Sequence, residues 1–383
     1  MTIKCISSLI LLVLPLILAY HTFAQPQIFD ITTYGATPDT DISEALLNAW
    51  EDAIVSANES KIVIPQGTWM LSQAELAGPG LGPIEIENQG TVLANADPNS
   101  MPNPKAQWIA VNYVNSFTLS GHGVFDGQGA LQAWATNDCN VNRNCSKLPI
   151  NLSFNFMNNS VIQDVTSKDS KNFHINCLAC MNVSFIRLTV VAPGDSPNTD
   201  GIHVARSTMV NIADSVIATG DDCVSMGDDL TQVYIHNVTC GPGHGISIGS
   251  LGRNLNERNI SGIYVKNCSF IQTQNGVRIK TWPSAPATII LSNLHFENLI
   301  MQNASNPIII DQQYCPWNLC NLTSPSLIEI RQVRIKNVKG TTSSSHAVKL
   351  SCSSAKPCDD VKIGDVDITS AKMEGTKLGF SLR

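Results

Sequence analysis

Val233-Tyr234-Ile235-His236-Asn237-Val238 is a phrase in which apolar and polar residues alternate up to an asparagine. Alternation of this kind predicts a short β-strand with one buried face, and asparagine is typical of the turn that ends it. Related phrases recur at intervals of 23 to 39 residues, beginning at Val183, Val210, Ile263, Leu294 and Val333, with weaker copies at Phe117 and Ser160. The chain is therefore built on a repeated strand unit.

A repeat of this length with little helical periodicity is typical of a solenoid of strands, in which each coil buries its apolar face on the next. A β-sandwich would need hairpin turns, and Asn275-Gly276 is the one Asn-Gly pair in the chain. The sequence thus predicts an all-β fold, a right-handed parallel β-helix, in preference to a sandwich. One helix is predicted, beginning at Asp41-Ile42-Ser43-Glu44 and running to Ile54, and it is expected to cap the solenoid.

The N-terminus carries an apolar run from Leu9 to Ala19, followed by the small residues Thr22 and Ala24. The run is too short to cross a bilayer, so residues 1–24 are predicted to be a secretory signal and residues 25–383 a single β-helix domain. The mature protein is expected to be soluble and secreted. The net charge of −7 argues against nucleic acid or an anionic membrane as a partner.

The chain has 12 cysteines, and in a secreted protein they favour disulfides over a metal site. Cys5 falls within the predicted signal, so eleven cysteines remain and one is expected to be unpaired. Close spacing suggests the pairs Cys139/Cys145, Cys315/Cys320 and Cys352/Cys358. Asn-x-Ser/Thr sequons, for example at Asn58 and Asn144, agree with a secretory route.

Ionisable residues recur at one phase of the repeat between Asn198 and Lys280. When the chain is aligned on its β-branched residues Ile202, Val224, Ile246 and Val277, the position two residues earlier is Asp200, Asp222 and His244 in the first three coils. Equivalent positions of stacked strands lie about 4.8 Å apart, so these three side chains are expected to form a column. Arg278 and Lys280 lie two apart in the next strand, share one side of it, and would extend the column with positive charge.

Crowded carboxylates do not all ionise freely, so at least one pKa in this column should be raised. A carboxylic acid beside a carboxylate can cleave a glycosidic bond, because the acid protonates the leaving oxygen and the carboxylate activates water or attacks carbon. Taken singly, Asn198-Thr199-Asp200 and Gly220-Asp221-Asp222 are ordinary turn sequences. Their shared phase and the basic pair that follows favour a catalytic site over turns alone.

Four ordered motifs carry a resemblance to a known family. They are Ser196-Pro197-Asn198-Thr199-Asp200-Gly201, Thr219-Gly220-Asp221-Asp222-Cys223, Cys240-Gly241-Pro242-Gly243-His244-Gly245 and Asn275-Gly276-Val277-Arg278-Ile279-Lys280-Thr281-Trp282. In this order and spacing they resemble the polygalacturonases, family 28 of the glycoside hydrolases. The resemblance extends from Tyr34-Gly35-Ala36 to Tyr314-Cys315-Pro316 and is closest to the plant enzymes of the pollen type, which are usually exo-acting.

The resemblance implies an inverting hydrolase of the extracellular cell wall that cuts α-1,4 bonds between galacturonates in demethylated pectin. It implies a monomer without metal or other cofactor. By motif, Asp221 is the general acid, Asp200 and Asp222 hold and activate the water, and His244 tunes their protonation. Arg278 and Lys280 would bind the substrate carboxylate, and Tyr314 and Asn198 would contact the substrate. Cys223 and Cys240 match a family disulfide.

Alternatives remain open at this point. Endo action is the first, because loops at residues 130–149 or 283–287 decide whether the cleft is closed at one end. A pectate lyase also acts on polygalacturonate, but it needs calcium and a basic residue. A non-catalytic pectin-binding wall protein could use the same solenoid. Hydrolases of rhamnogalacturonan are disfavoured by the pair Arg278 and Lys280.

Overall fold

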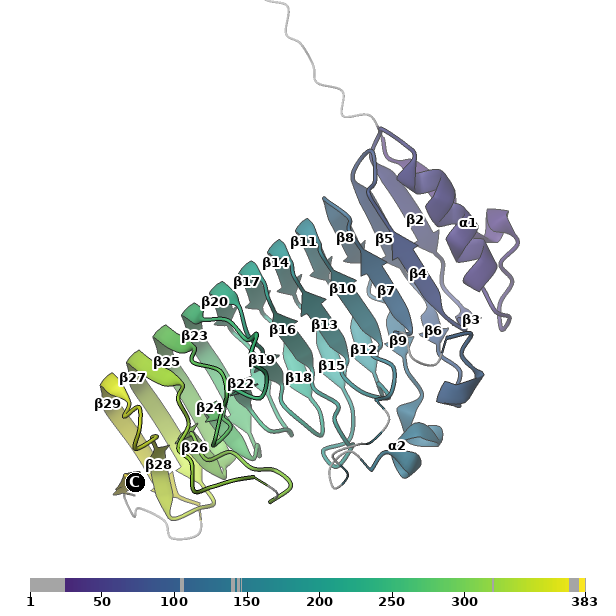
Figure 1. Cartoon of the computed structure of the whole chain (residues 1–383). Coiled ribbons are helices and arrows are strands. Elements are labelled where there is room, and N and C mark those ends of the chain that lie inside the picture. Colours follow the sequence, from purple (N-terminus) through teal and green to yellow (C-terminus); the bar gives the residue numbers. More distant parts are fainter. Residues whose placement is uncertain are drawn as a thin grey trace, which may run out of the picture.

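The computed structural model describes residues 25–103, 107–138, 142, 145, 147–318, 320–371 and 379–382. Figure 1 shows an elongated stack of coils that runs from the helix α1 at one end to the C-terminus at the other. All the paired strands are parallel, and they form one 19-stranded and one 11-stranded sheet. The predicted parallel β-helix is thus confirmed. We describe it as three rows of strands that run along the stack.

The first row contains the repeated phrase. Its register pairs Val183 with Val210, Val210 with Val233, and Val233 with Ile263, and continues to Leu294 and Val333, as the sequence alignment predicts. The row consists of β1 (Gln27–Asp30), β2 (Ser60–Ile64), β5 (Ile84–Asn88), β8 (Phe117–Ser120), β11 (Asn158–Gln163), β14 (Met181–Ile186), β17 (Thr208–Ala213), β20 (Leu230–His236), β23 (Ile260–Ile271), β25 (Ile290–Ala304), β27 (Glu329–Thr342) and β29 (Asp359–Ser370).

The second row is made of short strands and merges with the first where β23 pairs with both β20 and β21. It consists of β3 (Thr68–Met70), β6 (Thr91–Leu93), β9 (Val124–Asp126), β12 (Thr166–Lys168), β15 (Thr189–Val191), β18 (Val216–Ala218) and β21 (Thr239–Cys240). From β23 onwards each long strand bends through both rows.

The third row is the 11-stranded sheet, and it carries the candidate site. It consists of β4 (Ala74–Ala77), β7 (Ile109–Asn112), β10 (Leu152–Asn155), β13 (Ile175–Leu178), β16 (Ile202–Ala205), β19 (Val224–Met226), β22 (Ile246–Leu251), β24 (Asn275–Thr281), β26 (Asn306–Asp311), β28 (His346–Ser351) and β30 (Gly379–Leu382). Each coil therefore presents one segment of this row to the outer surface.

The core is a continuous apolar cluster inside the coils, and α1 (Ser43–Ile54) closes its N-terminal end. As predicted, the carboxylate of Asp41 accepts a hydrogen bond from Ser43 N (3.0 Å) at the start of this helix. Trp50 is buried, its ring edge lies against Phe117, and its Nε1 donates to Ala77 O (3.1 Å). The remaining helical turns in the described residues are short, namely α2 (Ala133–Thr136) and 3-10 turns at Ile31–Tyr34, Pro98–Ser100 and Gly129–Leu131.

The asparagines that end the repeated phrase form a ladder along the stack. Asn237, Asn267, Asn298 and Asn337 are all left-handed, with φ of 55°, 55°, 58° and 53°. The amide of Asn337 donates to Asn298 Oδ1 (2.7 Å), and that of Asn298 donates to Asn267 Oδ1 (2.9 Å). These residues are thus turn formers whose side chains also bind the neighbouring coil.

Three predicted disulfides are present, namely Cys223–Cys240, Cys315–Cys320 and Cys352–Cys358. Cys145 is also disulfide-bonded, and Cys139, its expected partner, lies outside the described residues.

The expectation of one unpaired cysteine is wrong, because Cys177, Cys180 and Cys268 are all free thiols. All three are buried, and in the strand register Cys177 lies beside Phe154 and Val204. Cys268 lies beside Leu299 in the register of its own row. Neighbouring coils therefore bring no cysteine to these two positions.

Residues 1–24, predicted to be a signal, and Asn144 also lie outside the described residues. Within the described part of the chain, no helix is both long enough and apolar enough to cross a membrane.

Candidate active site

The predicted site residues gather where the strands of the third row begin. The register pairs Ile202 with Val224, Val224 with Ile246, and Ile246 with Val277. These are the anchors of the sequence alignment, so Asp200, Asp222 and His244 do occupy equivalent positions on successive coils. The column predicted from spacing is therefore confirmed.

Asp222 lies at the centre of the site with its side chain only 1 % exposed. Its Oδ1 accepts hydrogen bonds from Ser247 Oγ and Arg278 Nη2, both at 2.8 Å, and its Oδ2 accepts one from Lys280 Nζ at 2.7 Å. Burial alone would raise the pKa of this carboxyl, but Lys280 and Arg278 outweigh burial and lower the pKa to about 2. Asp222 is therefore an anion at mildly acidic and at neutral pH.

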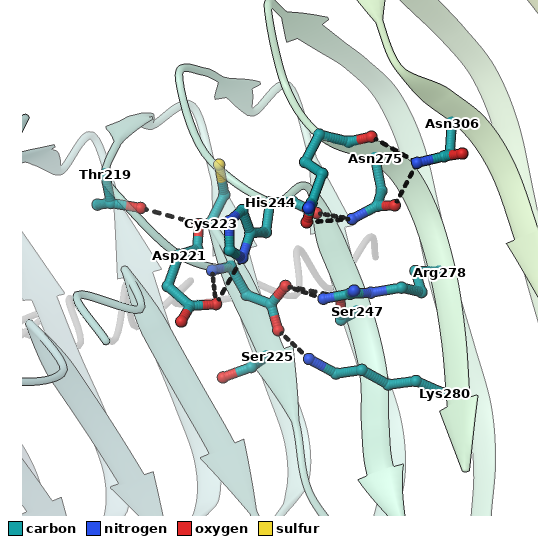
Figure 2. A network of polar contacts seen from close by, with 12 residues as sticks. Thr219, Asp221, Cys223, Ser225, His244, Ser247, Asn275, Arg278, Lys280 and Asn306 are labelled. Carbon is teal, nitrogen blue, oxygen red and sulfur yellow. Dashed lines mark hydrogen bonds and ion pairs between the residues drawn. The ribbon is translucent and has the colours of Figure 1, made fainter. Parts of the chain in front are cut away.

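Asp221 pairs with His244 through Oδ1 and Nδ1 at 2.9 Å, as Figure 2 shows. The same oxygen accepts from Asp222 N (2.8 Å), and His244 N donates to the carbonyl of Asp221 (2.7 Å). The side chains of Asp221 and His244 are 20 % and 34 % exposed, so a molecule in the cleft can reach them. The alignment of the repeats does not place Asp221 in the column. In the structure, the hydrogen bond between Asp221 and His244 places Asp221 beside the column.

Asp200 is buried on the other side of Asp222. Burial raises the pKa of this carboxyl well above its usual range, and the negative charges of Asp221 and Asp222 raise it further. A hydrogen bond from Ser225 and the charge of Lys280 oppose the shift without cancelling it. Neighbouring carboxyls of the cluster therefore differ in protonation, as the crowding of carboxylates predicts.

Aromatic rings form one wall of the site. The ring centroid of Tyr314 lies 5.7 Å from Arg278 Cζ and 5.3 Å from Lys280 Nζ. Trp282 meets Tyr314 edge-on at 5.7 Å, and Trp317 stacks on Trp282 at 5.5 Å. Burial raises the pKa of Tyr314, so its hydroxyl keeps its proton.

Arg278 and Lys280, which the sequence predicts to bind a substrate carboxylate, are both ion-paired with Asp222. Donor atoms of Asp221, Asp222 and His244 lie within 4.8 Å of one another, a spacing that a metal ion could use. However, two cations already occupy the Asp222 carboxylate, and they would repel a metal ion there.

The disulfide Cys223–Cys240 begins one residue after Asp222 and links the start of β19 to β21. It thereby ties the turn that carries Asp221 and Asp222 to the second row.

Asn198 lines a cavity of about 640 Å³ beside the column. Its backbone is left-handed, with φ of 54°, and its buried Oδ1 has no hydrogen-bond partner among the described residues. Sequence reasoning missed two other residues that line this cavity, Arg253 and Trp317. Neither residue lies in one of the four motifs. The only sequence signal for this part of the site is Trp282, the last residue of the fourth motif, which contacts both of them.

Comparison with known proteins identifies relatives over nearly the whole chain. Residues 55–378 match the family described as Glycosyl hydrolases family 28. The chain is 50 % identical over 360 residues to a polygalacturonase of Nicotiana tabacum, covering 94 % of this chain and 89 % of the relative. It is 46 % identical over 331 residues to an exopolygalacturonase of Oenothera organensis, covering 86 % and 90 %.

Solved structures have the same fold. An exopolygalacturonase from Thermotoga maritima superposes with a TM-score of 0.76 at 19 % identity, covering 93 % of this chain and 92 % of the other. An endo-xylogalacturonan hydrolase from Aspergillus tubingensis gives a TM-score of 0.76 at 22 % identity, covering 93 % and 98 %. At these identities the likeness concerns the β-helix alone.

Proposed function

This chain belongs to the glycosyl hydrolases of family 28, and we propose that it is an inverting polygalacturonase that hydrolyses α-1,4 bonds between galacturonates in demethylated pectin. The observation that carries the proposal is the contrast within one cluster of carboxyls. Asp222 is held as an anion by Lys280 and Arg278, whereas burial favours a proton on Asp200. A carboxylate beside a carboxyl that favours its proton can hold and activate the attacking water, and the neighbouring Asp221 supplies the acid of glycoside hydrolysis.

Asp221 is the general acid in this proposal. Its Oδ1 is held by His244 and by the backbone amide of Asp222, which leaves Oδ2 to carry the proton toward the cleft. As the glycosidic C–O bond breaks, the leaving oxygen takes that proton. His244 positions Asp221 and is not itself required to touch the sugar.

Asp200 and Asp222 hold the water that attacks the anomeric carbon from the opposite face, which inverts the configuration. Protonated Asp200 donates a hydrogen bond to the water, and the anion of Asp222 accepts the proton that the water loses. With a pKa of about 2, however, Asp222 is a weak base while both cations bind it. A substrate carboxylate that draws Lys280 and Arg278 toward itself would raise the pKa of Asp222, so substrate binding strengthens the base.

We propose exo action in preference to endo action. The loop residues Lys147, Leu148, Arg253 and Trp317 line the cavity beside the column, and loops at this place decide whether the cleft is closed at one end. Relatives from Oenothera organensis and Platanus acerifolia carry the name exopolygalacturonase. A time course on polygalacturonate distinguishes the two modes, because exo action releases monomer from the start and endo action releases a ladder of oligomers.

The same proposal includes pectin as the binding partner, a monomeric state and an extracellular place of action in the cell wall. Gel filtration of the secreted protein tests the last two points together, since the mass in the culture medium should be that of one glycosylated chain.

The experiment that tests the activity uses purified protein and polygalacturonate. We expect new reducing ends, no ultraviolet absorbance from an unsaturated product, and equal rates with and without chelator. Asp221→Asn should lower kcat by about 10²- to 10⁴-fold. Asp214→Asn removes an exposed carboxylate from a first-row turn and serves as the control with normal rates. An unsaturated product that depends on calcium would make the protein a lyase, and a natural protein that releases no reducing ends would be a binding protein. Full activity of Asp221→Asn would show that Asp221 is not the general acid.

A further inference from the structure

We propose that His203 positions the proton of Asp200 by donating its Nδ1–H to the hydroxyl of Ser225, which in turn donates to Asp200. His203 is thus a positioning residue, since Ser225 lies between it and the reacting groups. The inference rests on the proposed function, because it takes protonated Asp200 to bind the attacking water. His203 and Ser225 each lie two residues beyond the last residue of a motif, Gly201 and Cys223.

A second column of polar side chains runs beside the column of ionisable residues. The strand register pairs His203 with Ser225, Ser225 with Ser247, and Ser247 with Arg278. Each of the four follows a buried apolar residue of its strand, and side chains alternate between the two faces of a strand, so these four face outward. The second column therefore brings a hydroxyl beside each of the two buried carboxyls of the first.

The direction of the hydrogen bonds is fixed at Ser247. Arg278 Nε donates to Ser247 Oγ (3.1 Å), and Ser247 Oγ donates to Asp222 Oδ1 (2.8 Å). A guanidinium has N–H donors and no acceptor, so neither bond can be reversed. The hydroxyl proton of Ser247 therefore always lies toward Asp222, and it favours the anion of that residue.

Ser225 forms the corresponding bridge in the neighbouring coil. Its Oγ lies 2.8 Å from His203 Nδ1, and it hydrogen-bonds with Asp200. Ser225 is buried, so its one hydroxyl proton needs an acceptor within the protein. When that proton goes to Asp200, Nδ1 of His203 donates to the oxygen of Ser225. This chain of donors then has the same direction as the one that ends on Asp222.

The direction of the chain decides which oxygen of Asp200 carries the acid proton. The oxygen that accepts from Ser225 is the carbonyl oxygen of the acid, so the proton lies on the other oxygen, from which it is donated to the water. In the reverse direction Ser225 would donate to His203 and accept from Asp200, and the proton of Asp200 would lie away from the water. His203 therefore prepares Asp200 to bind the water.

His203 donates without adding a charge, because its imidazole is neutral. Burial lowers the pKa of His203 to about 4, and the positive charge of Lys280 acts in the same direction. A cation at this end of the chain would favour the anion of Asp200, as Arg278 favours the anion of Asp222. The other charges near His203 are those of Lys147, Asp222 and Asp228, the ring of Phe173 lies 5.2 Å from the imidazole, and Asp200 faces Asp221, Asp222 and Lys280.

The tautomer of His203 tests the proposal without reference to activity. Nitrogen chemical shifts of isotope-labelled histidine are measured by NMR at about pH 6, where an imidazole with a pKa of about 4 is neutral. The signal of His203 is assigned from its absence in His203→Asn. We expect the proton on Nδ1, with Nε2 as the acceptor. A proton on Nε2 would overturn the proposal, because Nδ1 would then accept from Ser225.

Rates of hydrolysis test the same chain of donors. Asparagine places a neutral N–H donor close to the position of Nδ1, whereas leucine has nearly the same shape and no polar atom in its side chain. We expect His203→Leu to lower kcat about tenfold with little change in KM, and His203→Asn to recover most of that loss. In a Ser225→Ala background the two substitutions should give equal rates, because the hydroxyl that links position 203 to Asp200 is gone.

Equal rates for His203→Leu and His203→Asn in the presence of Ser225 would overturn the proposal, and so would a difference that persists in Ser225→Ala. Failure of the proposed function looks different, since the unsubstituted protein would then release no reducing ends, whereas the tautomer of His203 would still be measurable. Melting curves confirm that each variant is folded.

Discussion

The carboxylate of Asp222 accepts three side-chain hydrogen bonds, two of them from cations, at a position that water hardly reaches. Burying an ion pair costs desolvation energy, and the geometry must be very good to compensate for it. Such an arrangement is weak evidence for stability and better explained by function. In the proposed function, Lys280 and Arg278 pair with the internal anion Asp222 until a substrate carboxylate competes for them.

Lys280→Met tests this idea at the level of one residue. Removing the ammonium group takes away the largest influence that lowers the pKa of Asp222, so that pKa should rise. We expect the acidic limb of the kcat/KM profile to move to higher pH and kcat/KM at the optimum to fall at least about 10²-fold. Lys266→Met, at an exposed pair with Glu297, is the control. An acidic limb that stays in place would show that Asp222 is not the titrating base.

Asp200→Asn tests the raised pKa of Asp200, which is opposite in direction to the lowered pKa of Asp222. In the folded protein the pKa of Asp200 lies above its unfolded value of about 3.9. Between those two values the folded state binds more protons than the unfolded state, so this group's contribution to stability is complete below about pH 4 and is lost as the pH rises through the folded pKa.

Asparagine cannot ionise, so Asp200→Asn should melt at a higher temperature than the natural protein at pH 7 and at a similar temperature near pH 4. It should also lose hydrolysis by orders of magnitude. Calorimetric melting at the two pH values measures the first expectation. A difference in melting temperature that does not change with pH would contradict it.

At the scale of the element, the asparagine ladder joins turn geometry to contacts between coils. Asn298 adopts φ of 58°, donates to Asn267 and accepts from Asn337. Alanine incurs a cost of roughly 1–2 kcal/mol in a left-handed backbone, whereas the polar side chain of asparagine offsets this cost and glycine does not incur it. Each hydrogen bond adds about 1 kcal/mol.

Asn298→Ala is therefore expected to destabilise the protein by about 3 kcal/mol, and Asn298→Gly by less, although both lose the same amide. Urea unfolding followed by tryptophan fluorescence measures the two losses. Equal losses for alanine and glycine would show that the backbone conformation contributes nothing at this turn.

The strand elements were predictable because their information is local and repeated. The phrase that begins at Val183 recurs with apolar residues at the same positions. Only one register of the stacked strands buries these residues in every coil. The same reasoning placed Asp200, Asp222 and His244 in a column. It could not predict the pairing of Asp221 with His244 or of Arg278 with Asp222, because these contacts depend on side-chain rotamers.

Features that depend on contacts between distant loops were also beyond the sequence. The contact of Arg253 with Trp282 and Trp317 joins three loops, and no periodic pattern in the sequence predicts it. The count of free cysteines failed for a related reason. Spacing suggests nearby partners, but Cys268 has Leu299 beside it in the stack.

For the whole molecule, the decisive structural problem is the end of the stack. A coil buries its core only against its neighbours, so a terminal coil needs a cap. Helix α1 supplies one with Leu46, Ala49, Trp50 and Ala53, all buried. Trp50→Ala should lower the free energy of unfolding by about 3–5 kcal/mol and expose an apolar surface that promotes aggregation.

Melting with simultaneous light scattering measures both effects of Trp50→Ala. Leu47→Ala removes a partly buried residue of the same helix and should cost less. Equal losses of stability from the two substitutions, without light scattering, would mean that α1 lies on the solenoid without closing the end of its core.

The third row also determines how the molecule would respond to force. Arg278 and Lys280 lie on β24, and the strands β26, β28 and β30 follow them in the row. A pull on the C-terminus would peel coils one at a time from that end, because each coil is attached to its neighbour alone. Hydrolysis would continue while β30 and β28 are stripped away and would fall when the segment between β26 and β27 detaches, because that segment carries Tyr314 and Trp317. A protein of this shape working in a stretched polymer network therefore has two expendable coils behind its active site.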